Sequence, residues 1–520
     1  MFKKYAILGT VCLGTLLCTY LGSCINIALP NIMAALNFDM DSVVWVSLGY
    51  LLANGSTLPL TGRMGDQFGA KKMYLVGLVT FLTGSVLCGI APNSAAMVAF
   101  RVIQGLGAGF LMPNAMTIVV ESFESHERGQ ALGIWNAVGA AGGGLGPTIG
   151  GILVERFDWR IVFFSVVPLC LLCIILTLTI IPSAKETRGQ AKIDYLGASF
   201  LIIAISTFLT ALNQGQKEGW DSLYIVSLFY AAFASFVIFM LVELKVKSPM
   251  IDFFLFRSAN FSIANITGFI TFVAFYGAMF LLPFFLKTIL DYSSIAAGVA
   301  VLPMTAAIMF FAPIGGKIAD RFGSRPPAFL GIILITTALF LMADINSDFA
   351  QRNLYPRLLL FGAGLGLTMS PLSNCVIAAL PRDKVGVGSG IFNLGKIIGG
   401  GVGVVFAETL LTRREIYHTA MLKEYMNQNY PQQEIARLMK VLWGSQGMDS
   451  SLIAQAAHGL VTGSGLLPEQ YLMLKGVLSS MVAKQAAVYS FQDVFHTVGI
   501  ICALAAVMAF FIRPNKKVLK

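Results

Sequence analysis

The chain has 520 residues, of which 56% are hydrophobic and only 12% are charged, and its mean hydropathy is +0.76. A soluble globular domain carries roughly 25% charged residues, so this composition excludes the soluble protein classes. The charges are confined to turns between apolar stretches of about 17 to 28 residues, which are long enough to cross a hydrocarbon core ~30 Å thick. The sequence therefore predicts an all-α polytopic membrane protein.

The net charge of +10 does not indicate a nucleic-acid partner, because of where the charges fall. If Lys3 and Lys4 are cytoplasmic, roughly twenty Lys and Arg lie in even-numbered turns and termini, and about four lie in the short loops of the opposite side. This bias places the N-terminus in the cytoplasm of an inner-membrane protein, and the even number of spans predicted below leaves both termini there. The anionic inner leaflet of the lipid bilayer is the expected partner of this charge.

Fourteen membrane spans are predicted along the chain. In chain order they cover residues 5–30, 42–61, 73–91, 95–120, 129–151, 161–181, 195–213, 223–243, 260–287, 295–314, 327–343, 355–380, 386–411 and 491–513. We predict an N-terminal six-helix bundle over residues 1–181, two inserted membrane helices with cytoplasmic linkers over 182–258, and a C-terminal six-helix bundle over 259–520.

The long loop 412–490 belongs to the second bundle and is predicted on the extracytoplasmic side. Its apolar residues recur at helical spacing, which predicts two or three amphipathic helices, first over Ile435–Leu442 and then over Leu472–Met481. Two interpretations stay open. The loop is either an inert cap that packs against the bundle or a docking site for another protein.

An internal repeat relates the two bundles. The turn GRMGDQFGAKK at Gly62–Lys72 returns as GGKIADRFGSR at Gly315–Arg325. ALGIWNAVGAAGGG at residues 131–144 returns as GSGIFNLGKIIGGG at residues 388–401, with Asn136 matching Asn393, and Arg101 has a counterpart in Arg357. These matches share an offset of about 254 to 257 residues. Six spans duplicated, with two inserted between the copies, is the simplest account, and such duplicated bundles move solutes.

The charged turn has a mechanical interpretation. Its glycines permit a tight turn and close helix contact. Asp66 is placed to pair with an arginine or with the positive N-terminus of a neighbouring helix and so to hold the cytoplasmic face shut. The alternative is a plain positive-inside turn. Because the aspartate recurs at Asp320, we favour the gate, whose residues are Gly62, Arg63, Gly65, Asp66, Gly69 and Lys71, with Asp320, Arg321, Gly323 and Arg325 in the second copy.

Other patterns carry no cofactor prediction. GIFNLGKI at Gly390–Ile397 has the spacing of a phosphate-binding loop, but it lacks the Ser or Thr for magnesium and lies in an apolar span. The eight cysteines all lie in or beside apolar spans, which indicates neither a disulfide framework nor a metal site. A membrane enzyme is the least expected class, since no cluster of nucleophile, base and metal ligands is found.

The sequence resembles the major facilitator superfamily, and within it the fourteen-span drug:proton antiporters of the EmrB/QacA type. Both copies of the charged turn match the superfamily signature, and RVIQGLGAG at Arg101–Gly109 resembles its fourth-span motif. GAAGGGLGPTIGG at Gly139–Gly151 resembles the antiporter motif of the fifth span. NIALP at Asn26–Pro30, WRIVFFSVVP at residues 159–168 and IDYLGA at residues 193–198 resemble further signatures, so the likeness covers nearly the whole chain.

The resemblance implies two six-span bundles that rock around a central cavity, driven by inward proton flow without ATP or a cofactor. By analogy with the family, Arg101 would assist proton movement. A charge at that depth costs ~2.5–3.5 kcal/mol on insertion scales, so we favour this role over the alternative of a structural residue that pairs with a carbonyl group. The antiporter motif residues Gly139, Gly146, Pro147, Gly150 and Gly151 would shape a bend where helices slide. Ser23, Asn26, Gln104, Asn136, Lys287, Asn393 and Lys396 are the candidates for lining the substrate cavity.

The sequence departs from the family pattern in its charges. The acid that the family carries in its first span is replaced by Leu21, whereas Lys287 and Lys396 stand where the family tends to have Gln and Arg. Glu408 is the clearest acid within a span and is a candidate proton carrier; the alternative is an interfacial residue neutralised by Arg413 or Arg414. A substrate cavity with Arg101, Lys287 and Lys396 but few acids should repel lipophilic dications and accept neutral or weakly anionic amphiphiles.

Proton-driven efflux of hydrophobic small molecules is therefore the expected function. A dedicated exporter of one native metabolite, such as a siderophore or a fatty acid, is a second hypothesis. A membrane receptor or scaffold that has lost transport is a third, from a different class. If the 412–490 loop docks a partner, a periplasmic adaptor of the membrane-fusion type is the one that the resemblance implies.

The internal repeat predicts that the two charged turns lie on the same membrane face. Single cysteines placed in each turn of a cysteine-free chain should both react with an impermeant maleimide from the cytoplasmic side only. Labelling from opposite sides would contradict the duplication and the transporter hypothesis that rests on it.

Overall fold

The computed structural model describes residues 2–38, 42–182, 194–246, 251, 253–290, 292, 299–344, 351–381, 384–427 and 468–513. The first six spans are α1 (Phe2–Leu36), α2 (Val44–Phe68), α3 (Ala70–Gly89), α4 (Ser94–Ser122), α5 (Arg128–Arg156), and α6 (Trp159–Phe164) continued by α7 (Val166–Ile180). Two further spans are α8 (Tyr195–Glu218) and α9 (Leu223–Lys245). After the short η1 (Phe253–Arg257) come α10 (Ala259–Thr288), α12 (Leu302–Phe322), α13 (Arg325–Ala343), α14 (Gln351–Ala378), α15 (Val385–Asn427) and α18 (Pro468–Phe510).

These helices confirm the predicted all-α membrane fold. Thirteen of the spans are long and apolar enough to cross a bilayer by themselves. The remaining span is α2, which carries Arg63, Asp66 and several hydroxyl side chains and is therefore less apolar. Its 25 residues reach ~37 Å at 1.5 Å per residue, and it packs along α4 and α15. We therefore count α2 as the fourteenth membrane helix.

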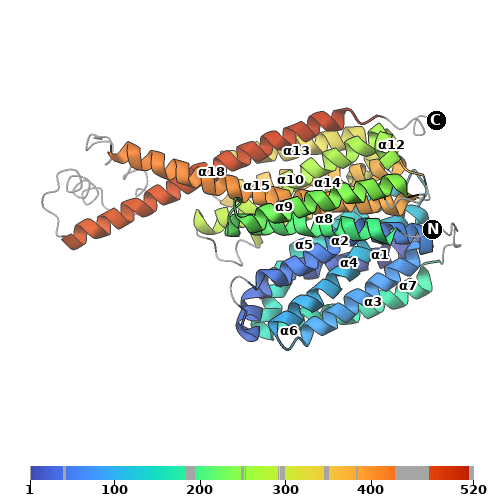
Figure 1. Ribbon diagram of the computed structural model, residues 1–520. Coiled ribbons are helices and arrows are strands. Elements are labelled where there is room, and N and C mark those ends of the chain that lie inside the picture. Colours follow the sequence, from blue (N-terminus) through green and yellow to red (C-terminus); the bar gives the residue numbers. More distant parts are fainter. Residues whose placement is uncertain are drawn as a thin grey trace.

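The helices gather around two separate apolar cores. One core joins buried side chains of the helices α1 to α7, together with Ile377 of α14 and Val385 of α15. The other joins buried side chains of α10, α12, α13, α14, α15 and α18. Each core is thus made largely by one copy of the internal repeat. We call α1 to α7 the first half, and α10 with α12 to α15 and α18 the second half. They lie side by side with their axes roughly along one direction (Figure 1).

Two seams join the halves, α2 against α15 and α5 against α12. The inserted pair covers the first of them. Leu209 of α8 is fully buried in a small cluster with Phe239 of α9, Leu52 of α2 and Ile397 of α15. In the described ranges, α8 packs on α2 and α15 as well as on α9, and no such pair of helices packs over the α5–α12 seam. The insertion therefore makes the two sides of the molecule unequal.

Two long helices project from one end of the bundle (Figure 1). α15 and α18 have 43 residues each, ~64 Å of helix against a hydrocarbon core of ~30 Å. His418 Nε2 lies 2.9 Å from Asp493 Oδ2, and Arg414 Nε lies 3.4 Å from the same oxygen. These contacts fasten the projecting parts to each other.

Parts of the predicted 412–490 loop belong to the two projecting helices. Residues 412–427 continue α15 without a break, and residues 468–490 begin α18, so the predicted run Leu472–Met481 lies inside a long helix. The predicted run Ile435–Leu442 lies outside the described residues. The start of α1 and the end of α18 lie at the opposite end of the bundle (Figure 1).

Glycines let the seams close tightly. A Cβ atom on Gly133 of α5 would lie 2.3 Å from the Ala312 carbonyl oxygen of α12, and one on Gly390 of α15 would lie 2.6 Å from the Leu58 carbonyl oxygen of α2. Gly133 and Gly390 occupy the same position in the internal repeat. Both seams therefore use the same device, a backbone surface without side chains.

We expect Gly133→Ala and Gly143→Ala, both on α5, to change stability in opposite directions. A Cβ atom on Gly133 overlaps the α12 backbone, whereas one on Gly143 meets nothing within 4 Å. Overpacking costs ~1–3 kcal/mol, while replacing a helical glycine with alanine gains ~0.5–1 kcal/mol. Thermal unfolding in detergent should show a lower Tm for Gly133→Ala and an equal or higher Tm for Gly143→Ala. Equal losses in both variants would contradict the tight seam.

Candidate functional site: inter-half contacts and a buried lysine

Asp66 fastens the first half to the second. It lies near the end of α2, and its carboxylate accepts hydrogen bonds from the backbone N–H groups of Gly386 at 2.7 Å and Val387 at 2.9 Å. These are the first N–H groups of α15, which have no partner within their own helix. We call this arrangement the Asp66 contact.

Asp320 makes the equivalent contact in the other direction. It lies near the end of α12 and accepts from the backbone N–H groups of Gly129 at 2.8 Å and Gln130 at 2.9 Å, at the start of α5. Asn374 Nδ2 lies 3.3 Å from the same carboxylate. Together these bonds form the Asp320 contact.

The two contacts share one physical basis. Each places a carboxylate at the N-terminus of a helix, where the helix dipole amounts to roughly half a positive charge and favours an anion by ~0.3–1 kcal/mol or more when partly buried. Close approach depends on glycine, since a Cβ atom on Gly62 would lie 2.2 Å from the Gly386 carbonyl oxygen and one on Gly316 would lie 1.9 Å from that of Gly129. Both contacts lie at the end of the bundle where the chain begins.

The basic residues of the charged turns fasten neighbours within each half instead. Lys71 Nζ donates to the carbonyl oxygens of Leu178 at 3.1 Å and Ile181 at 2.5 Å, at the C-terminal end of α7. The Arg325 guanidinium lies 4.0 Å from the centre of the Phe510 ring on α18.

The remaining members of the predicted gate shape or flank the turns. Gly69 and Gly323 have φ of +94° and +85°, a conformation that only glycine adopts at little cost, and Gly65 packs against Asn114, whose Oδ1 atom would lie 1.9 Å from an added Cβ. Arg63 is half-buried and Arg321 is exposed, and neither donates to the aspartates in a described hydrogen bond.

A further ion pair lies at the start of α5. Lys4 of α1 donates to the Glu127 carboxylate. Glu127 is the residue before α5, outside the membrane spans, and the bond from Lys4 lowers the pKa of its carboxyl group. Glu127 is therefore ionised at neutral pH and adds negative charge at the helix terminus that Asp320 contacts.

Arg101 is buried in the first half, with a side chain 1% exposed. Its Nε donates to the Val46 carbonyl oxygen of α2 at 2.8 Å, and its Nη1 donates to Gln104 Oε1. The guanidinium lies 4.4 Å from the Tyr50 ring centre, and Gln104 Nε2 donates to Ser85 Oγ at 2.7 Å. Arg101 thus ties α4 to α2 through carbonyl, amide and aromatic partners and has no ion pair among the described residues.

The antiporter motif forms the surface that α5 packs against α1. A Cβ atom on Gly146 would lie 1.9 Å from Ser23 Oγ, and one on Gly150 would lie 2.3 Å from Cys24 Sγ. A Cβ on Gly139 would lie 3.4 Å from Thr15 Cγ2, and one on Gly151 would lie 3.9 Å from Ile27. Pro147 lies inside α5. The motif therefore brings α5 close to α1 within the first half.

Lys396 of α15 lies between the halves. Its Nζ is 5.8 Å from the ring centre of Trp135 on α5, 5.4 Å from that of Phe272 on α10 and 5.0 Å from that of Phe392 on α15. Trp135 is held by a hydrogen bond from its Nε1 to Thr15 Oγ1 at 2.7 Å. We call this group the Lys396 cage. Aromatic faces attract cations by ~0.5–2 kcal/mol.

The other predicted cavity residues are placed differently. Ser23 Oγ donates to carbonyl oxygens of its own helix, at 3.1 Å from Thr19 and 3.0 Å from Tyr20. Asn26 is exposed and accepts from Ser47 at 3.4 Å. Asn393 donates to the Ser389 carbonyl oxygen at 2.9 Å, whereas Asn136 Nδ2 is buried without a partner in the described structure. Lys287 lies in α10, and its side chain is outside the described part of the chain.

Glu408 lies in the middle third of α15 and is half-buried. Arg414, one of its two predicted partners, pairs with Asp493 of α18 instead. Among the described ion pairs and side-chain hydrogen bonds, none includes the Glu408 carboxyl group. Glu408 is therefore a half-buried acid whose carboxyl group has no ion-pair or hydrogen-bond partner among the described residues.

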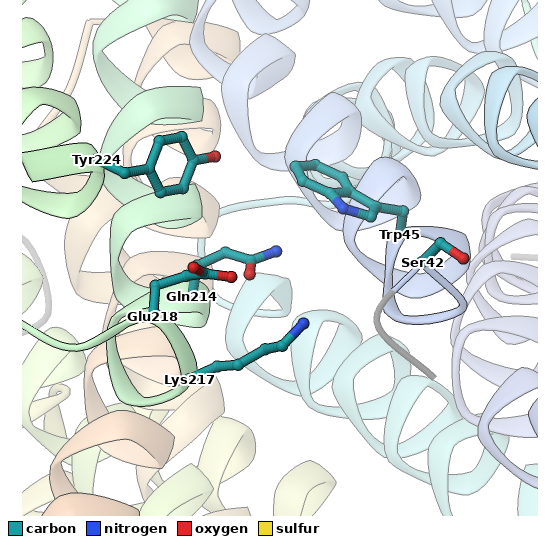
Figure 2. A pocket seen from close by; sticks show the side chains of 6 residues that line it. All are labelled: Ser42, Trp45, Gln214, Lys217, Glu218 and Tyr224. Carbon is teal, nitrogen blue, oxygen red and sulfur yellow. The ribbon is translucent and has the colours of Figure 1, made fainter. Parts of the chain in front are cut away.

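A cavity that was not predicted lies at the end of the bundle opposite the Asp66 contact. It has a volume of about 470 Å³ and lies between the start of α2 and the inserted pair (Figure 2). Its lining residues are Ser42, Trp45, Gln214, Lys217, Glu218 and Tyr224. Trp45 and Tyr224 face it from opposite sides (Figure 2), and such residues commonly lie at a membrane surface.

Sequence reasoning missed Trp135, Phe272 and Phe392. A signal for two of them was present, because Trp135 and Phe392 occupy the same position of the internal repeat, directly before Asn136 and Asn393. Phe272 lies in an apolar span where nothing in its spacing distinguishes it from a packing residue.

Two six-span halves joined by paired contacts at one membrane face define a helical secondary transporter rather than an enzyme. The profile of the Major Facilitator Superfamily matches residues 11–404, and the chain belongs to this superfamily.

The curated relatives include several drug-resistance proteins. The chain is 32% identical to Multidrug resistance protein 3 of Bacillus subtilis, over 71% of this chain and 72% of that protein. It is 30% identical to the riboflavin transporter RibZ of Clostridioides difficile, over 83% and 94%. It is 27% identical to the tetracenomycin C resistance and export protein of Streptomyces glaucescens, over 98% and 92%.

Solved structures agree on the fold alone. The human organic anion transporter MFSD10 superposes with a TM-score of 0.60 at 15% identity, over 97% of this chain and 99% of that one. The proton:xylose symporter XylE superposes with a TM-score of 0.59 at 14% identity, over 99% and 96%.

We expect Asp66→Ala to loosen the end of the bundle where α15 begins. The variant loses two charge-assisted hydrogen bonds, each worth ~1.5–3 kcal/mol, and leaves the first N–H groups of α15 without their partner. The measurement uses a single cysteine at position 387, which is buried beside Asp66. This cysteine should react with a maleimide about tenfold faster in the Asp66→Ala variant than in the same cysteine variant with Asp66 intact.

The matched control is Asp158→Ala. Asp158 also caps a helix N-terminus, accepting from Arg160 N at 2.8 Å, but it acts within the first half and at an exposed turn. Asp158→Ala should leave the labelling rate at residue 387 unchanged. Equal acceleration by both variants would show that the effect is general destabilisation rather than loss of the Asp66 contact.

Proposed function

We propose that this protein is a proton-coupled antiporter of the EmrB/QacA type, which exports hydrophobic or amphiphilic small molecules across the bacterial cytoplasmic membrane by alternating access. Both termini would lie in the cytoplasm. The observation that carries the proposal is the pair of inter-half contacts at Asp66 and Asp320. They close one end of the bundle by bonds that a small rotation of the halves would break together.

The geometry of these contacts supports a gate. Each half supplies one aspartate carboxylate and one helix start that binds the carboxylate of the other half. Rotation of one half away from the other would therefore break both contacts. The partners are backbone N–H groups at helix starts, which water can also satisfy once the seam opens. The cost of opening is therefore limited to a few hydrogen bonds.

The relatives support export as the direction and drugs as the substrate class. Several relatives are named for drug resistance or export, among them Multidrug resistance protein 3 and the tetracenomycin C resistance and export protein. RibZ is a riboflavin transporter by its name, and a dedicated transporter of one metabolite, such as a siderophore or a fatty acid, is the alternative within the same class.

We propose that Glu408 carries the coupling proton and that Arg101 assists it indirectly. Glu408 is half-buried without an ion-pair partner in the described residues, and an unpaired acid in a membrane helix is by default a candidate proton site. Arg101 is held by α2 and α4, so its charge would act on protons through the field it creates rather than by direct transfer.

The projecting parts of α15 and α18 are the proposed surface for an adaptor protein of the membrane-fusion type. A receptor or scaffold without transport is the remaining alternative from another class. Substrate-driven proton movement separates it from the antiporter, because a scaffold moves no protons.

The deciding experiment measures proton release in proteoliposomes when substrate is added. We expect the wild-type protein to release protons on addition of an exported dye and Glu408→Gln to lose at least ~90% of this signal, because an amide cannot carry a proton. Glu155→Gln is the matched control, since Glu155 is an exposed acid near the end of α5. Wild-type behaviour of Glu408→Gln would remove Glu408 from the coupling, and no proton release by the wild type with any dye would overturn the antiporter.

A further inference from the structure

Lys396 is a cation without an anion at the junction of the two halves. In the described residues, no carboxylate lies within ion-pair distance of it and no hydrogen-bond acceptor is assigned to it. Its neighbours are the rings of Trp135, Phe272 and Phe392. The residue is half-buried. The ammonium group therefore lies where the two halves meet, with aromatic rings from both halves as its described neighbours.

This position is energetically costly. A lysine at the centre of a membrane helix costs ~2.5–3.5 kcal/mol on insertion scales, and attraction to aromatic faces returns ~0.5–2 kcal/mol. The equivalent position of the repeat on α5 is Gly139, which carries no charge. The repeated helix can therefore be built without a lysine here. A charge kept in one half and absent from the other is not explained by the shared architecture.

The rings of the Lys396 cage are held in place by further contacts. Trp135 and Phe392 are repeat-related and stand on α5 and α15, so each half contributes one wall. The indole is fixed by Thr15. The Phe272 ring contacts Tyr276 with ring centres 6.2 Å apart and Phe275 at 6.4 Å, which backs the third wall with further rings.

We propose that Lys396 and the rings of Trp135, Phe272 and Phe392 bind the anionic group of a flat aromatic amphiphile, a carboxylate or a sulfonate. This inference rests on the proposed transport function and names its substrate class. The ammonium pairs with the anion, and a charge-assisted bond is strengthened where water is excluded. The three rings pack against the aromatic body of the ligand.

Arg101 does not compete for this role. It is bonded to Val46 and Gln104 and stacked on Tyr50 within the first half. A quaternary ammonium ligand in the cage would face Lys396 as a like charge, which selects against it. Because the walls come from both halves, the ligand would contact both, and parting of the halves would dismantle its site.

The test uses two dyes of one skeleton. 8-Anilinonaphthalene-1-sulfonate is an anion, and N-phenyl-1-naphthylamine is the same ring system without the sulfonate. Binding is measured by calorimetric titration of the full chain in nanodiscs, with empty nanodiscs subtracted. The wild type should bind the sulfonate at least ~10-fold more tightly than the amine.

The variants separate the charge from the rings. Lys396→Gln should weaken sulfonate binding at least ~10-fold and change amine binding less than ~3-fold, whereas Lys396→Arg should retain the preference. Lys245→Gln, which removes an exposed lysine at the end of α9, should change neither. Lys396→Met is a second variant in case the glutamine variant fails to fold, and it should raise Tm because a buried unpaired charge is removed.

Equal weakening of both dyes in Lys396→Gln, or no sulfonate preference in the wild type, would overturn the anion site. Proteoliposome transport separates this failure from failure of the proposed function. If the dyes move with protons but Lys396→Gln leaves the sulfonate unaffected, the anion site is wrong and the antiporter stands. If the binding results are as expected but no proton movement accompanies the dye, the site stands and the antiporter is wrong.

Discussion

The structure depends on the close approach of helix backbones at two seams, α2 with α15 and α5 with α12. Apolar attraction does not hold helices together in lipid as it does in water, because lipid tails are as apolar as the side chains they would replace. Close packing and hydrogen bonds take that role, and both need small residues. Gly62 with Gly386 and Gly316 with Gly129 bring the backbones together, and only then can Asp66 and Asp320 reach the helix starts opposite.

This arrangement explains why the aspartates bond to backbone rather than to basic side chains. A helix start offers two converging N–H groups and a fixed dipole without any side-chain entropy to lose. Lys71 and Arg325, the basic residues of the same turns, hold α7 and α18 inside their own halves. Each turn thus contacts both halves, its own half through a basic side chain and the other half through an aspartate.

The inserted pair breaks the symmetry of the duplicated fold. α8 packs on both helices of the α2–α15 seam and so covers it, whereas the α5–α12 seam has no such cover in the described chain. The cations are also unequal between halves. Arg101 is satisfied inside the first half, and Lys396 stands unpaired at the junction. The two halves share one pseudo-symmetric architecture, but the inserted pair makes the two seams unequal and the cations make the two halves unequal.

Much of the fold followed from sequence because hydrophobic length and internal repetition are local properties. Fourteen spans, two of them inserted, were predictable since each must be long enough to cross the bilayer whatever it packs against. Even the polar α2 was found, because its charged turn repeats in α12. The repeat also singled out Asp66 and Asp320 as equivalent residues before their partners were known.

The partners themselves were decided only by tertiary structure, because they lie on segments about 190 and 320 residues away in the chain and no local pattern specifies which helix start faces which carboxylate. The same holds for Lys396, whose three rings come from α5, α10 and α15. It also holds for Arg414, which turns to Asp493 rather than Glu408 because α15 and α18 continue side by side beyond the bundle. The sequence alone determined the number, type and kinship of the helices, since these depend on composition along one segment. Packing determined which charges are paired, because pairing depends on which segments the seams bring together.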